Sequence, residues 1–228
     1  MNPLQGVIRI YVKDKWSWFL FPWMILLFSF GINLFTAFLT GGKEDVYTGG
    51  IVAIYIYMLI AGIVTLMQTF PFVLSFSMRR TDFFLGTTTA VILVSAVTTI
   101  LLYLLSLLEE MTDAWGLKLH FFYLPYLNDG APWEQMWIYF VALVHMFFLG
   151  FVITSIYKRY DTRILNIFFG ALFLLFSASG ILATYYGWWG NLFHWVIHHT
   201  AFDLSMWAFG ATVIYMIVSY LLLRRATV

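Results

Sequence analysis

Six long apolar runs, with almost no charged side chain inside them, constrain this chain more than any other feature of its sequence. They lie at about residues 19–38, 51–78, 87–108, 136–157, 164–186 and 204–223. A helix rises about 1.5 Å per residue, so each run is long enough to cross the roughly 30 Å hydrocarbon core of a bilayer. Of the 228 residues only 10% are charged, against about 25% in soluble domains. The sequence therefore predicts an all-α integral membrane protein, one domain with six transmembrane helices.

Basic residues predict the orientation of these spans. With six crossings both termini lie on one side. Ten of the twelve Lys and Arg residues fall on that side, at the termini and in the loops after the second and fourth spans. The exceptions are Lys43 and Lys118, in the loops after the first and third spans. Because basic residues flanking spans stay in the cytoplasm, we predict a multi-pass protein of the cytoplasmic membrane with both termini cytoplasmic.

Three segments outside regular spans carry further predictions. Residues 1–18 are expected to form an amphipathic helix on the membrane surface, with a flexible basic leader as the alternative. Its apolar stripe is Leu4, Val7, Ile8 and Tyr11, and its basic residues are Arg9, Lys13 and Lys15. Pro71 predicts that the second span either kinks or continues into the cytosol. Residues 187–203 are apolar but too short to cross, which favours a re-entrant hairpin between the fifth and sixth spans.

Residue types that carry covalent chemistry are scarce. The chain has no Cys, which excludes disulfides and thiolate metal sites. No phosphate-binding G-x-x-x-x-G-K-[ST] loop, G-x-S-x-G nucleophile elbow or H-E-x-x-H motif occurs. We therefore expect no enzymatic activity and no cofactor in this chain. A net charge of +1 gives no reason to expect a nucleic-acid partner.

Polar side chains within the spans are candidates for a substrate pathway. They are Asn33, Gln68, His145 and Asn166. A proton-driven carrier needs buried carboxylates or a charged relay, and none is present in the spans. His145 is therefore expected to make a hydrogen-bonded contact between helices rather than to relay protons. If the chain moves a substrate, spans rich in aromatic residues and poor in charge indicate that the substrate is amphipathic.

Histidines near the fifth and sixth spans suggest an alternative function as a membrane metalloprotein. His194 and His198 would share one helical face, at the i, i+4 spacing that zinc sites use. His120 and His199 could join them, but no acidic residue stands between His194 and His198 to act as a base. Packing beside Trp residues at the membrane interface is the expected role.

The connection between the second and third spans carries the most specific motif. Phe70-Pro71-Phe72 is followed by Arg79-Arg80, Asp82-Phe83-Phe84 and Leu85-Gly86-Thr87. This pattern resembles ABC transporter type-2 permeases, particularly the small ones of Gram-positive bacteria. The six-span layout is similar across the whole chain.

The resemblance implies a cytosolic coupling helix between spans two and three, which docks on a separate ATP-binding subunit that holds ATP and Mg. The contact residues it implies are Phe76, Arg79, Arg80, Thr81, Asp82 and Phe83, with Lys158, Arg159 and Arg163 as a second contact. A second permease copy would complete a homodimer or heterodimer in the bacterial cytoplasmic membrane. Such a protein would export a peptide, an antibiotic or a lipid-like molecule by alternating access. A non-transporting sensor or scaffold subunit is the alternative.

Overall fold

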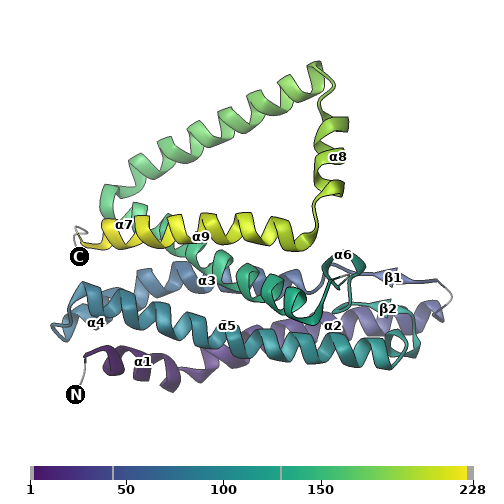
Figure 1. Ribbon diagram of the computed structural model, residues 1–228. Coiled ribbons are helices and arrows are strands. Elements are labelled where there is room, and N and C mark those ends of the chain that lie inside the picture. The colour runs from purple at the N-terminus through teal and green to yellow at the C-terminus, as the bar shows by residue number, and fades with distance from the viewer. Residues whose placement is uncertain (1–2, 43, 129, 225–228) are drawn as a thin grey trace.

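The computed structural model describes residues 3–42, 44–128 and 130–224, and almost all of it is helical (Figure 1). The α-helices are α1 (Pro3–Lys13), α2 (Phe21–Thr40), α3 (Val52–Val64), α4 (Phe70–Ser75), α5 (Arg80–Met111), α6 (Pro125–Asn128), α7 (Pro132–Tyr185), α8 (Trp189–His198) and α9 (Ala201–Arg224). Two π-helical turns, η1 (Trp16–Leu20) and η2 (Thr65–Thr69), and one 3-10 turn, η3 (Ala114–Gly116), lie between them. Two short strands, β1 (Val46–Tyr47) and β2 (Leu119–His120), pair in parallel.

Six segments of the described chain are long and apolar enough to cross a membrane, as predicted. They are Trp16–Thr40, Val52–Ser75, Arg80–Met111, Pro132–Tyr160, Asn166–Tyr185 and Ala201–Arg224. The architecture is therefore that of an all-α, multi-pass membrane protein. Figure 1 shows α1 and the last turns of α9 at the same end of the helical bundle, as an even number of crossings requires.

Each π-helical turn stands directly before a Phe-Pro pair. The N–H of Phe21 bonds to the carbonyl of Trp16 ahead of Pro22. The N–H of Phe70 bonds to the carbonyl of Thr65 ahead of Pro71. Proline has no N–H to donate and its ring crowds the carbonyl four residues earlier, so the turn before it widens. The helix is therefore distorted by a widened turn before Pro71, and a second widened turn lies before Pro22. The kink or cytosolic extension expected at Pro71 stays a prediction.

The core lies where α3, α5 and α9 pack around the first half of α7. Phe147, Phe148 and Phe151 on α7 are fully buried. Gly62 on α3 and Gly150 on α7 bring these two helices together, because a Cβ on either would overlap the other helix's backbone at Phe147 or Leu59. The close approach of α3 and α7 therefore requires glycine at both positions.

The second half of α7 leaves this core. The residues predicted to separate the fourth and fifth spans, 158–163, stay helical, so both spans belong to α7. In the most apolar stretch of the fourth span half of the residues are buried, whereas in that of the fifth span only 6% are. Figure 1 shows the second half of α7 diverging from the bundle, with α8 joining its far end to α9.

The predicted amphipathic helix forms as α1, and part of its apolar stripe packs against protein. The Leu4 side chain, which belongs to the predicted stripe, lies outside the described side chains. Val7 and Tyr11 are buried, and the Tyr11 hydroxyl lies 2.7 Å from Oγ1 of Thr87 on α5. Gly86 leaves the space that Val7 fills. Burial raises the pKa of the Tyr11 phenol, so this hydroxyl stays protonated. Helical periodicity predicted the stripe but could not tell a lipid surface from a neighbouring helix.

The re-entrant hairpin predicted between the fifth and sixth spans is wrong. The structure has a single ten-residue helix there, α8. Gly187, with φ of 68°, supplies the turn after α7, but Gly190 lies inside α8 and starts no second turn. Without a turn in its middle, the segment has length for only one helix of about 15 Å.

Candidate functional site

The connection between α4 and α5 is a turn of four residues, 76–79, at the end of the bundle that carries both termini (Figure 1). The N–H groups of Phe76 and Ser77 bond back to the carbonyls of Val73 and Leu74, at 3.2 and 2.9 Å. α5 begins directly at Arg80. No separate helix lies between the second and third spans in this fully described segment, so the predicted coupling helix is wrong as an element. α5 already begins at Arg80, so only four residues separate it from α4. Four residues are too few to form a separate coupling helix.

The six residues assigned to this connection differ in exposure. Phe76 is 62% exposed and Arg79 is also exposed, whereas Thr81 and Asp82 are half-buried in the first turn of α5. Asp82 is the acidic residue of that turn, where a carboxylate is favoured by the helix dipole. Phe83 is fully buried, with its ring centroid 5.2 Å from that of Phe70. Phe83 therefore belongs to the core and cannot be a surface contact.

Arg80 connects α5 to the end of α9. Its Nη1 donates to the carbonyl oxygens of Leu223 and Arg224, at 3.5 and 3.2 Å. The last carbonyls of a helix lack intrahelical partners and carry partial negative charge. Arg80 therefore stabilises the C-terminal end of α9, and this internal role accounts for its guanidinium.

The second predicted contact region lies on the other side of α9. Lys158 and Arg159 are half-buried and Arg163 is exposed, all within α7. Arg159 and Arg224 line a cavity of about 590 Å³, and the Arg159 guanidinium lies 5.8 Å from the Tyr160 ring centre. The end of α9 thus lies between the two predicted contact regions and contributes a basic group of its own.

The four polar residues proposed for a substrate pathway do not converge on one site. The Asn33 amide donates to Ser29 O within its own helix, at 2.8 Å. Asn166 is exposed on the outlying half of α7. Gln68, in η2, lines a cavity between the first two spans.

His145 makes the contact between helices that its isolation in the sequence predicted. Its Nδ1 lies 3.1 Å from the carbonyl of Ala208 and 2.9 Å from Oγ1 of Thr212, both on α9. The Ala208 carbonyl can only accept, whereas the Thr212 hydroxyl can donate or accept, so the tautomer of His145 decides which of the two hydrogen bonds forms. The contact joins the two helices with the most extensive packing in the described chain.

The candidate metal ligands His194 and His198 lie stacked on α8, with ring centroids 6.0 Å apart. His199 turns Nδ1 back to the carbonyl of Trp195, at 2.7 Å, and His120 lies instead between Asp45 and Glu109, 3.8 Å from each. Within the described ranges no three His, Asp or Glu side chains are placed to share a metal ion. In the part of the chain that the structure describes, His194 and His198 therefore have no third ligand.

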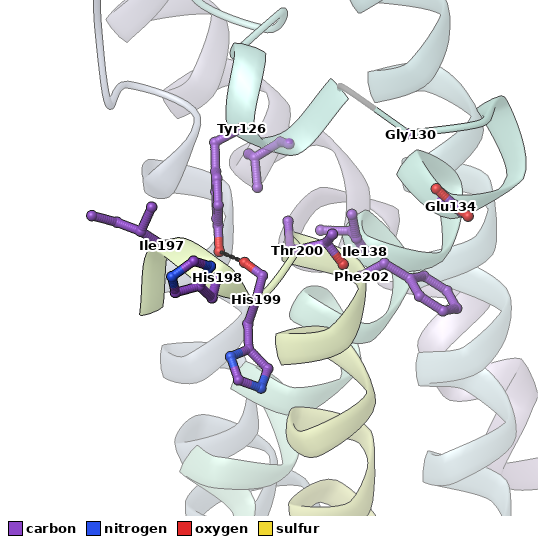
Figure 2. Close-up of a pocket in the computed structure, with 11 residues that line it drawn as sticks. Tyr126, Gly130, Glu134, Ile138, Ile197, His198, His199, Thr200 and Phe202 are labelled. Atoms are coloured by element: carbon purple, nitrogen blue, oxygen red, sulfur yellow. Dashed lines mark hydrogen bonds between the residues drawn. The ribbon is translucent and has the colours of Figure 1, made fainter. Parts of the chain in front are cut away.

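A cavity of about 340 Å³ lies where α6, α7, α8 and α9 meet at the end opposite the termini (Figure 2). The Tyr126 hydroxyl donates to the carbonyl of His199 across it, at 3.0 Å. Figure 2 shows the Glu134 carboxylate well apart from the rings of His198 and His199. Glu134 instead accepts from the N–H of Ala131 and so caps α7. These groups hold the helix ends together and leave no acid–base pair facing a ligand.

Glu109, which was not identified as a candidate from the sequence, accepts several hydrogen bonds at the end of the bundle opposite the termini. Its carboxylate is 1% exposed. It accepts from the backbone N–H groups of Phe121, Phe122 and Tyr123 at 2.8–3.2 Å, and from Nε1 of Trp115 at 3.0 Å. Glu109 thus anchors the segment between α5 and α7. A glutamate at the end of an apolar run resembles an ordinary interfacial charge, so this role could not be predicted from the sequence.

No protein-family model, curated protein or solved structure matches this chain.

Proposed function

We propose that this chain is the membrane permease subunit of an ATP-driven ABC exporter, which moves an amphipathic substrate while a separate ATP-binding subunit hydrolyses ATP. The observation that carries the proposal is the α4–α5 turn. It has an exposed Phe76 and Arg79, it lies beside both termini, and it carries the motif that resembles type-2 permeases. The basic surface at Arg159 and Arg224 is a second contact for the same partner.

The mechanism follows from how rigidly the turn is connected to the spans. Phe83 is packed in the core and Arg80 holds the end of α9. A displacement of the turn by a partner would therefore move α5 and α9 together, and α9 is packed along α7. A permease dimer would use such coupled helix movements to alternate between inward- and outward-facing states. Both the dimer and the cytoplasmic location of the turn belong to this proposal.

The test is co-expression with an ATP-binding-cassette protein, which is to be sought first in the reading frames adjacent to this one. Arg79→Glu and Phe76→Ala should lower copurification of the ATPase and its stimulation in nanodiscs by about tenfold, as expected when a charged contact or an aromatic anchor is lost. Arg80→Glu is a poor probe because it also breaks the contact with α9. Glu44→Lys is the control, an exposed charge reversal at the opposite end.

Full coupling in the Arg79→Glu and Phe76→Ala variants would contradict this assignment. Uphill transport by the purified chain without any ATPase would contradict the whole proposal. A stable complex that hydrolyses ATP and moves no amphiphile would favour the sensor or scaffold alternative.

A further inference from the structure

A cavity of about 310 Å³ lies between the start of the first span and the second span. Both π-helical turns contribute to its walls, η1 through Ser17 and Trp18, and η2 through Thr65, Gln68 and Thr69. Widened turns of this kind occur frequently at functional sites, and the volume is at the lower end of the range for ligand pockets. The two Phe-Pro pairs thus produce two local distortions that face one another across one cavity.

The walls are held together independently of any ligand. The Tyr57 hydroxyl on α3 donates to the carbonyl of Ser17 in η1, at 2.7 Å. The widened hydrogen-bond pattern of η1 leaves this carbonyl available to a side chain from the neighbouring helix. Trp18 packs against Tyr11 and Phe147, with ring centroids 4.6 and 5.7 Å away. The cavity is therefore a preformed feature of the fold.

Polar groups on the η2 wall have unmet hydrogen-bonding capacity. Thr65 is only 3% exposed, and its hydroxyl has no hydrogen-bond partner among the described residues. The Gln68 amide, which is exposed, likewise has none within that part of the chain. The hydrocarbon of a membrane supplies no hydrogen-bond partner to such groups. A polar ligand in the cavity would satisfy both groups.

Asp14 gives the cavity its charge. Oδ1 accepts from the N–H and the hydroxyl of Ser17, at 3.3 and 3.0 Å. No Lys, Arg or His among the described residues forms an ion pair with this carboxylate. Lys13 and Lys15 flank it in sequence but do not line the cavity. A cation is the ligand group that this carboxylate can bind.

The remaining wall is apolar and open. Phe21, Ile60 and Val64 line the cavity and are 45%, 48% and 39% exposed. All three lie in segments that can span the membrane, so this opening would face lipid. The site therefore has a polar, anionic end and an apolar side through which an acyl chain can leave.

We propose that this cavity binds the head group of an amine-bearing amphiphile. The ammonium pairs with Asp14 over the face of Trp18, Thr65 and Gln68 hydrogen-bond the head group, and the chain runs along Phe21 and Val64. The molecule is either a lipid with an amine head group or a soluble cationic amphiphile that has entered the bilayer. Binding requires neither ATP nor a partner; only its identification as the exported substrate rests on the proposed function.

The test uses the full chain in phosphatidylcholine nanodiscs with a diazirine-bearing hexadecylamine as photoprobe. Crosslinks should map by mass spectrometry to residues 14–21 and 57–69, and dodecylamine should compete whereas dodecyl sulfate of equal chain length should not. Asp14→Asn should weaken labelling about tenfold, since a charge-assisted contact is lost. Asparagine keeps an oxygen that can accept from Ser17, so the local hydrogen bonds between residues 14 and 17 can survive.

Gln68→Leu is the second variant, and it should weaken labelling several-fold without touching the hydrogen bonds between Asp14 and Ser17. Thr36→Val is the control, because its hydroxyl bonds only to its own helix, at the carbonyl of Ile32. Phosphatidylethanolamine in the nanodisc would reduce labelling if the occupant is a lipid, and would leave it unchanged if the occupant is a soluble amphiphile. Equal competition by dodecyl sulfate, or wild-type labelling of Asp14→Asn, would overturn the proposal. None of these results depends on an ATPase, so they stand apart from the test of transport.

Discussion

Glu109 shows how one side chain can fix a whole connection. Three consecutive backbone N–H groups and an indole N–H converge on a carboxylate that is 1% exposed. In Glu109→Gln one accepting oxygen becomes an NH₂ group that faces these donors. We expect a loss of about 3 kcal/mol, which lowers the melting temperature by roughly 6–12 °C for a chain of this size.

Thermal unfolding in detergent, followed by circular dichroism, measures this effect. Glu110→Gln is the matched control, because its side chain is exposed one residue further along α5. It should change stability by no more than about 0.5 kcal/mol. Equal melting temperatures for the two variants would mean that the amide cluster does not need the charge.

Individual residue roles were predictable only where chemistry left few options. His145, the one ionisable side chain deep in a span, was predicted as an interhelical contact and is one. Phe83 was assigned to a surface contact through the motif resemblance and is in the core, because a motif does not say which of its residues face outward. The role of Glu109 depends on donors 12–14 residues further along the chain, whose approach no local pattern encodes.

At the scale of elements, the crossing of α3 and α7 is the contact most sensitive to a single methyl group. In Gly62→Ala the new Cβ would overlap the carbonyl of Phe147, so the helices must separate. Overpacking of this kind costs about 1–3 kcal/mol or more. Gly170→Ala, on the outlying half of α7, meets nothing within 4 Å. It should be neutral or stabilise by about 0.5–1 kcal/mol, since glycine is a poor helix former.

The melting temperature of each alanine variant is compared with that of the unmodified chain. Gly62→Ala should lower it by several degrees, whereas Gly170→Ala should leave it unchanged or raise it. A destabilisation shared by both would mean that the outlying half of α7 packs as tightly as the crossing does.

The elements themselves were predicted well and their junctions poorly. Six spans follow from hydropathy alone, because each run must satisfy its own backbone hydrogen bonds in the membrane. Residues 158–163 look like a loop from their charge, yet they contain neither Gly nor Pro, and nothing prevents the helix from continuing through them. The 76–79 turn and the single helix α8 depend on where neighbouring helices start, which composition does not fix.

At the scale of the whole molecule, the termini and the α4–α5 turn lie at one end of the bundle (Figure 1). This arrangement predicts that they all face the same side of the membrane. Positive charge gathers at that end, and we predict that it is cytoplasmic. The chain has no cysteine, so single cysteines can be introduced without removing any native residue of that type. Ser77→Cys in the turn and Glu44→Cys at the opposite end both replace exposed side chains.

In intact bacteria a membrane-impermeant maleimide should label Glu44→Cys and leave Ser77→Cys unlabelled until the cells are opened. Far-UV circular dichroism of both variants serves as the folding control. The reversed pattern would place the turn outside the cell, where no ATP-binding subunit could reach it, and would exclude the proposed coupling. The amine-binding cavity would then open to the outer leaflet, so this one measurement also decides which side of the membrane supplies its ligand.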